Sequence, residues 1–261
     1  MPRSTTGTTP TPLRITRPLA TLLRDPSPVP LLRPAARGAA MLTALVAALV
    51  TAVLGWRYAG DTGAGRTDRE LAALLDTQYG VPRVLAEAFA ALGGPLPVGV
   101  ALLVLAPLAW MVRGGRGLAL VLVGPPTAMI TTSLVLKPLV ERTRGGELAF
   151  PSGHTTSVAS LAVTCGVLVL GLATVPRALR LLAVAGLAGL VLAVGAGLVV
   201  RGYHYPTDTL GALGVAVAVV LCAALAVDAW SDVVADPGPD PRSFDPRERP
   251  TDVLPRAARE G

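Results

Sequence analysis

The chain has few of the side chains that soluble proteins use for charge and for chemistry. Charged residues make up only 15% of its 261 positions, and it contains a single lysine, two histidines and two cysteines. An ordinary soluble domain carries about 25% charged residues. Apolar residues account for 52% of this chain, and its mean hydropathy is +0.58. This composition excludes an ordinary soluble domain and predicts a protein of the lipid bilayer.

The same shortages exclude several kinds of partner and cofactor. The net charge is +6, but the arginines are scattered, with no basic run and few interleaved aromatics, so we expect no nucleic-acid partner. Cys165 and Cys222 both lie inside apolar runs and lack the paired spacing of a metal site, so we interpret them as small core residues. The sequence offers no carboxylate-rich ligand set for Mg²⁺, and we expect neither a metal nor a cofactor.

Apolar runs of nearly constant length dominate the remaining sequence. Each is close to the roughly 20 residues that cross a bilayer core. The runs cover residues 39–55, 95–112, 117–136, 155–174, 181–200 and 209–227. The predicted fold is therefore all-α, an integral membrane bundle of six helices within a domain at residues 38–230. Pro107, Pro125 and Pro126 fall inside predicted spans, where they favour kinks over helix ends.

Three segments lie outside these spans. Residues 1–37 are rich in proline, threonine and arginine, and residues 231–261 are rich in aspartate, proline and arginine, so both are predicted to be disordered tails. Residues 56–93 mix charges with short amphipathic pieces, and we expect them to lie along the membrane surface. Leu71, Leu74 and Leu75 share one helical face there, before a break at residues 80–82.

The positions of the arginines predict the orientation, because positive charge is retained on the cytoplasmic side. The tail at residues 1–37 contains six arginines, and pairs mark two of the short connections between spans. The arginines concerned are Arg3, Arg14, Arg17, Arg24, Arg33 and Arg37 in the tail, and Arg113, Arg116, Arg177 and Arg180 in the connections. Both termini are therefore predicted to be cytoplasmic. Residues 56–93, 137–154 and 201–208 are predicted to face the outside.

The lysine and both histidines fall within residues 137–208, in three polar clusters. Lys137 ends the third predicted span and Arg144 follows it by seven residues, so the two cations can converge on an anion or simply reach the interface from the membrane edge. Ser152, Gly153 and His154 come directly before the fourth span. Ser152 can cap that helix, and the N–H groups of its first turn can bind a phosphate.

The third cluster contains Arg201, His204 and Asp208. A carboxylate four residues after a histidine can hold one imidazole nitrogen and leave the other as a nucleophile or base. Arg201 precedes His204 by three residues, near enough to bind the same anion. An interfacial histidine beside a capping aspartate would explain this cluster alone, but a similar coincidence would be needed three times on one membrane face.

These clusters resemble the type 2 phosphatidic acid phosphatase superfamily, the lipid phosphate phosphatases related to vanadium haloperoxidases. The family signature is Lys-x6-Arg-Pro, then Pro-Ser-Gly-His, then Ser-Arg-x5-His-x3-Asp, and the match covers roughly residues 130–215. The positions that agree are Lys137, Arg144, Ser152, Gly153, His154, His204 and Asp208.

Two positions depart from the signature. Gly145 stands where the first motif has proline, and Gly197 and Leu198 stand where the third motif has Ser-Arg. Neither Gly197 nor Leu198 can hold a phosphate through its side chain. We expect Arg201, one helical turn later, to replace the missing arginine.

The resemblance implies a metal-independent phosphatase that works through a phosphohistidine. In that mechanism His204 attacks phosphorus, Asp208 orients it, and His154 protonates the leaving group. Lys137, Arg144, Arg201 and the N–H groups near Ser152 and Gly153 hold the phosphate oxygens. The substrate is expected to be a lipid phosphate or polyprenyl diphosphate in the bilayer.

Two other functions stay open from the sequence. One is a phosphatase or phosphotransferase with a water-soluble substrate. The other is a non-enzymatic protein with a degenerate site that binds or moves phospholipid, which the departure at Leu198 favours. The sequence does not specify the lipid or the oligomeric state.

Overall fold

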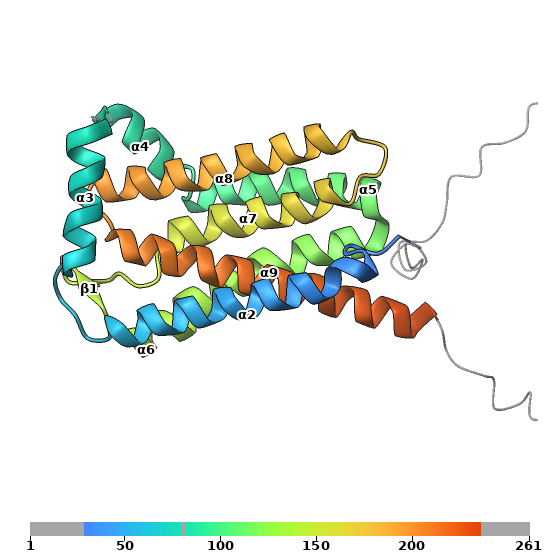
Figure 1. The fold of residues 1–261 in the computed structure, drawn as a ribbon, viewed down its shortest axis with the longest axis horizontal. Coiled ribbons are helices and arrows are strands. Elements are labelled where there is room, and N and C mark those ends of the chain that lie inside the picture. The colour runs from blue at the N-terminus through green and yellow to red at the C-terminus, as the bar shows by residue number, and fades with distance from the viewer. Residues whose placement is uncertain (1–28, 80–81, 236–261) are drawn as a thin grey trace, which may run out of the picture.

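The computed structural model describes residues 29–79 and 82–235, and it is built almost entirely of helices (Figure 1). The long helices are α2 (Pro34–Arg57), α5 (Pro95–Ile130), α7 (Gly153–Leu170), α8 (Arg177–Val200) and α9 (Pro206–Ala235). Shorter elements are α3 (Arg66–Tyr79), α4 (Arg83–Ala91), the π-helix η1 (Thr131–Leu136), α6 (Lys137–Val140), and strands β1 (Thr143–Arg144) and β2 (Glu147–Leu148). The predicted all-α class is confirmed.

The long helices have the length and composition of membrane spans. Within the described residues, five segments qualify: Pro34–Arg57, Pro95–Val140, Gly153–Leu170, Arg177–Val200 and Pro206–Val234. Large apolar side chains on their outer surfaces are exposed, such as Leu103 at 77% and Leu192 at 66%. So much exposed apolar surface is unfavourable in water and favourable against lipid tails. The chain is therefore a multi-pass membrane protein.

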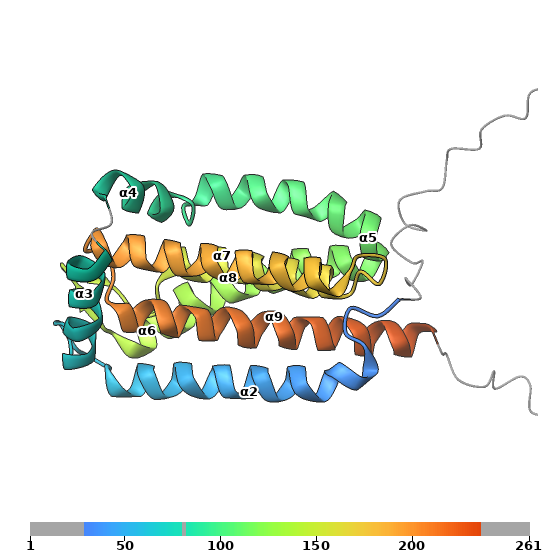
Figure 2. The same cartoon turned by 45° about the horizontal axis from the view of Figure 1, so that its top comes forward.

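The segment Pro95–Val140 accounts for the difference between five segments and the six predicted spans. Its 46 residues would form a straight helix about 69 Å long, more than twice the roughly 30 Å thickness of a bilayer core. The helical path is broken at Gly114, where φ is 55° and ψ is −143°, a conformation that only glycine adopts readily. Figure 2 shows α5 turning back at its far end. Gly114 thus divides this segment into two arms, while the three prolines lie within helical backbone.

Helix α7 is the most buried of the long helices and lies at the centre of the packing. One apolar cluster joins it to α5 and α9, and a second joins it to α4, α8 and α9. Its polar residues are also buried, and Thr156 shares a hydrogen bond of 3.0 Å with Thr132 of η1. Buried hydroxyl groups that bond across helices are a common means of association inside membranes. The helix therefore has fixed neighbours at the end where the polar clusters lie.

The two ends of the bundle differ. Helix α3 runs across the bundle at one end, beside the end of α8 and the start of α9, together with α4 and the β1–β2 hairpin (Figure 1). Helix α2 begins and α9 ends at the opposite end (Figure 2). The described parts of the chain thus enter and leave at the same end of the bundle.

The ordered domain extends beyond its predicted boundaries at residues 38 and 230, at both ends. Residues 29–37 belong to the first predicted tail, but the backbone N–H groups of Leu31 and Leu32 both donate to the carboxylate of Asp228 at 2.9 Å. Leu31 is buried and α2 already begins at Pro34. Helix α9 also continues to Ala235, past the predicted boundary at residue 230. The remaining tail residues, 1–28 and 236–261, lie outside the described residues.

Candidate active site

The structure brings residues from all three predicted clusters together at the end of the bundle crossed by α3. The imidazole of His154 lies within electrostatic range of both His204 and Lys137. Lys137 in turn lies within range of Asp208, and its Nζ donates to the carbonyl oxygen of Leu148 at 2.8 Å. Lys137 directly follows η1, and single π-helical turns of this kind often occur at functional sites.

His204 and Asp208 face each other across the start of α9. His204 Nδ1 lies 3.6 Å from Asp208 Oδ2, and the carboxylate is fully buried while the imidazole is largely buried. This separation is longer than a hydrogen bond, and such contacts often shorten only when substrate binds. Asp208 Oδ2 also accepts the N–H of Tyr205 at 2.9 Å. The carboxylate therefore faces Nδ1 and leaves Nε2 as the nitrogen available for reaction.

Asp208 is held by Arg142, an arginine that no sequence motif singles out. Arg142 is fully buried and donates from Nη1 to Asp208 Oδ1 and to Thr207 Oγ1, each at 2.7 Å. Its Nη2 donates to Asp68 Oδ2 of α3 at 2.5 Å. Asp68 Oδ1 accepts both the N–H and the hydroxyl of Thr207, at 3.0 and 2.7 Å. A buried chain of hydrogen bonds therefore runs from α3 through Arg142 to Asp208.

Asp68 is ionised in this network. Burial alone would raise the pKa of Asp68, but the hydrogen bonds from Thr207 and Arg142, together with the charge of Arg142, outweigh burial and lower it. Because the folded pKa lies below the ordinary value of 3.8, the pairing contributes stability above that pH and loses it as the pH falls through the lowered value.

Two arginines lie against the ring of Tyr205. Arg142 and Arg144 each place the guanidinium carbon 4.3 Å from its centroid, and Arg142 also lies 4.2 Å from the ring of Tyr58. Such contacts favour fixed guanidinium positions. Arg144 further donates from Nε to the carbonyl oxygen of Gly202 at 2.7 Å. Arg144 is therefore anchored beside the His204 turn, and within the described residues its Nη atoms donate to no protein group.

The hairpin that carries Arg144 explains the first departure from the family signature. Strands β1 and β2 pair through Arg144 and Glu147, and the two residues between them, Gly145 and Gly146, have φ of 59° and 88°. Two residues with positive φ form the tight turn that suits antiparallel strands. Proline, whose φ is fixed near −65°, cannot occupy position 145 in this turn. The glycine is thus required by the local backbone.

The second cluster forms the start of α7, as predicted. Ser152 is the N-cap, and its hydroxyl oxygen accepts the N–H of Thr155 at 3.3 Å. The Ser152 side chain is fully buried, so it acts through the helix and not as a direct ligand. An added Cβ at Gly153 would meet no atom within 4 Å, and His154 is exposed. Open space therefore adjoins Gly153, in the first turn of α7, whose N–H groups are of the kind that binds anions.

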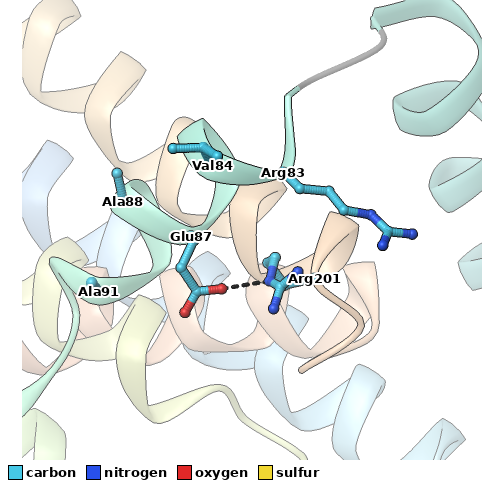
Figure 3. A pocket seen from close by; sticks show the side chains of 6 residues that line it. All are labelled: Arg83, Val84, Glu87, Ala88, Ala91 and Arg201. Atoms are coloured by element: carbon cyan, nitrogen blue, oxygen red, sulfur yellow. Dashed lines mark ion pairs between the residues drawn. The ribbon is translucent and has the colours of Figure 1, made fainter.

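Arg201 faces Glu87 of α4 (Figure 3). Its Nε lies 2.5 Å from Glu87 Oε2, and both side chains line a cavity of about 500 Å³. Its guanidinium carbon also lies 5.7 Å from the ring of Tyr203. Among the described residues, none of these contacts joins Arg201 to either histidine. In this structure the guanidinium of Arg201 is therefore paired with Glu87.

The second departure, at Gly197 and Leu198, coincides with the packing of α4 on α8. Leu198 is buried in the apolar cluster that includes Ala90 and Val194. An added Cβ at Gly197 would lie 2.6 Å from the carbonyl oxygen of Ala86. These two positions therefore hold α4 against α8 and provide no charge for an anion.

A polar cavity adjoins the histidine turn. It has a volume of about 380 Å³ and is lined by the polar residues Asp68, Arg69, Arg144, His204 and Tyr205 and by four apolar residues, Ala64, Ala72, Val199 and Pro206. Val199 and Pro206 also line a second cavity of about 720 Å³, whose walls are α8, α9 and the leucines of α3. The predicted apolar face of Leu71, Leu74 and Leu75 thus covers an apolar groove next to the polar cavity.

The apolar groove continues along the bundle. A further cavity of about 400 Å³ shares Val191, Leu192 and Leu213 with it and extends to Val184 and Leu221. From Val199 to Val184 the wall formed by α8 is about 22 Å long at 1.5 Å per residue. The polar cavity therefore adjoins an apolar path that runs along α8, first beside α9 and then beside α7.

Comparison with known proteins gives one family match and one structural match. The PAP2 superfamily model matches residues 119–232, the segment that holds both histidines, Asp208 and Arg142. No curated protein matches the chain. The fold is similar to that of a transmembrane PAP2 type phosphatidylglycerolphosphate phosphatase from Bacillus subtilis, with a TM-score of 0.57, 18% identity, and coverage of 74% of this chain and 97% of that one. Residues 119–232 therefore match the PAP2 superfamily, and most of the chain shares the fold of that phosphatase.

Proposed function

We propose that the protein is a membrane phosphatase that hydrolyses a lipid phosphate or polyprenyl diphosphate through a phosphohistidine, without a metal. The observation that carries this proposal is the junction of the two cavities at Val199 and Pro206. On one side of it lie His204 and Arg144, and on the other side lies an apolar groove between α8 and α9. A lipid phosphate has this same polarity, with an anionic head on an apolar chain.

In the proposed reaction His204 Nε2 attacks the phosphorus, forming a P–N bond while the P–O bond to the leaving group breaks. His154 gives its proton to the departing oxygen. It then takes a proton from a water molecule that attacks the phosphohistidine, which releases inorganic phosphate and regenerates His204. Asp208 orients His204 through Nδ1 and stabilises its positive charge.

The phosphate oxygens are held by groups that need no metal. Lys137 and Arg144 supply fixed positive charge, and the start of α7 at Ser152 and Gly153 supplies N–H donors. Arg201 joins them only if its pair with Glu87 opens. In the bilayer we place six spans, counting the two arms around Gly114 separately, with both termini cytoplasmic and the histidines on the outer face.

A non-enzymatic role in binding or moving phospholipid is the second candidate, because Leu198 is buried and Arg201 is already paired. One experiment separates the two. Purified protein in mixed micelles is given a panel of lipid phosphates and diphosphates, and inorganic phosphate is measured with EDTA, with Mg²⁺ and with vanadate. Release that persists in EDTA and stops with vanadate supports the proposal. Lipid binding without release supports the second candidate, and loss in EDTA with rescue by Mg²⁺ refutes metal independence.

A further inference from the structure

The buried chain of hydrogen bonds from Asp68 through Arg142 to Asp208 contains two acidic side chains and one basic side chain. Asp68 is 1% exposed, and Arg142 and Asp208 are fully buried. Two carboxylates and one guanidinium leave one net negative charge in a region where water does not screen it. Charge of this kind is costly unless another group compensates for it.

His204 is placed to receive that charge. Its Nδ1 faces Asp208 Oδ2, whereas Arg142 binds the other oxygen, Oδ1. If Arg142 had no second carboxylate, its full positive charge would act on Asp208 and offset the negative charge that His204 experiences. Asp68 accepts a hydrogen bond from Arg142 and offsets part of its positive charge. The negative charge of Asp208 therefore still acts on the imidazole.

We propose that Asp68 and Arg142 are positioning residues for His204. Arg142 fixes the Asp208 carboxylate, and Asp68 offsets the charge of Arg142, so that the pair orients the imidazole and keeps a net negative charge facing it without touching substrate. The catalytic role of Asp68 and Arg142 rests on the proposed function, because the charge that faces His204 matters to turnover only if His204 is the nucleophile.

Other charged groups also act on His204 and must stay constant in a test. They are Arg144 of β1, Arg69 of α3, His154 of α7 and, through His154 and Asp208, Lys137 of α6. A substitution at Asp68 removes none of them. The lost charge of Asp68 therefore affects His204 through the buried hydrogen bonds and across the cavity that Asp68 and His204 both line.

The chain's histidine content allows a direct measurement. With two histidines in the sequence, protein labelled only at histidine and carrying no histidine tag gives two imidazole signals by NMR, and His154→Gln assigns them. Their titration with pH is followed in micelles without substrate. This measurement needs no turnover, so its failure is distinguishable from a failure of the proposed function.

We expect Asp68→Asn to move the midpoint of the His204 titration to lower pH, because one negative charge is lost near the imidazole. The double variant Asp68→Asn/Arg142→Gln restores one net negative charge and gives two amides that can bond to each other. Its midpoint should return toward that of the unsubstituted protein. The acid limb of the rate profile with a lipid phosphate should move in parallel.

The matched control is Glu70→Gln, which neutralises an exposed carboxylate on α3 that pairs with Arg66. It should leave the midpoint unchanged. A merely structural role for the chain predicts that the double variant is at least as disturbed as Asp68→Asn. That result, or an unchanged midpoint in Asp68→Asn, would overturn the proposal.

Discussion

Arg201 and Glu87 form an ion pair of 2.5 Å between the turn after α8 and the outer helix α4. The pair is partly exposed, and the two side chains lie in a cavity separate from that of His204. A phosphate that bound Arg201 would have to compete with Glu87. The pair therefore gives a direct test of whether Arg201 replaces the family arginine that is missing at Leu198.

We predict that Arg201→Ala lowers kcat/KM for a lipid phosphate by about tenfold or more, the effect of losing one charged hydrogen bond to the phosphate. Glu87→Gln should lower KM, because it frees Arg201. Leu198 is buried, so alanine there would cost about 2 to 5 kcal/mol by leaving a cavity, and Leu198→Met is the suitable control. Equal and small effects of Arg201→Ala and Leu198→Met would show that Arg201 is only an interfacial charge.

Features set by local sequence could be predicted. The long helices follow from uninterrupted apolar runs, the cap at Ser152 follows from its position before such a run, and the shared face of Leu71, Leu74 and Leu75 follows from helical spacing. Each of these depends on residues within a few positions of one another. The turn at Gly114 lies between two of the apolar runs, which is why the sequence favours two spans there.

The support behind the histidines could not be predicted. Arg142 lies among the six residues between Lys137 and Arg144, and no spacing separates it from the other arginines. Its partner Asp68 is 74 positions away on a helix expected only at the membrane surface. A single aspartate so far along the chain forms no motif with Arg142, so their pairing cannot be predicted from spacing. The buried contact appears only when α3 folds over the ends of α8 and α9, and the pairing of Arg201 with Glu87 has the same origin.

We predict that the end of the bundle with α3 faces outward. In a chain without Cys165 and Cys222, single cysteines at Glu147 and Tyr203 should react with an impermeant thiol reagent in intact cells, since both positions are exposed. Glu147 is preferred to Gly146, whose φ of 88° disfavours a side chain. A cysteine at Thr174, in the turn between α7 and α8, is the control and should react only after lysis. The opposite labelling would reverse the topology.

We predict that the groove between α8 and α9 holds the apolar chain of the substrate. Ala196→Phe should fill part of the groove and raise KM for a long-chain lipid phosphate several-fold, while a short-chain phosphate is hydrolysed as before. Ala183→Phe makes the same change at an exposed position of α8 outside the groove and should have no effect. Equal losses for long and short chains in Ala196→Phe would show that the helix packing, and not chain binding, was disturbed.

The two histidines are predicted to differ in their dependence on the leaving group. His204 has Asp208 at Nδ1, so we assign it as the nucleophile, and His204→Ala should abolish turnover of every substrate because no phosphoenzyme can form. His154 is exposed at the start of α7 and is assigned as the acid. An alkoxide must be protonated as it departs, whereas a nitrophenolate need not be.

His154→Ala should therefore lose nearly all activity toward an alkyl lipid phosphate, about a hundredfold or more, and keep a measurable fraction toward an aryl phosphate. Rates of phosphate release for the two substrates, measured side by side for both variants, give this comparison. Thermal unfolding of the same samples separates a chemical defect from a folding defect. This control matters most for His204, which lies beside the buried Asp208. If the aryl phosphate instead restored activity to His204→Ala and left His154→Ala inactive, the roles of nucleophile and acid would have to be exchanged.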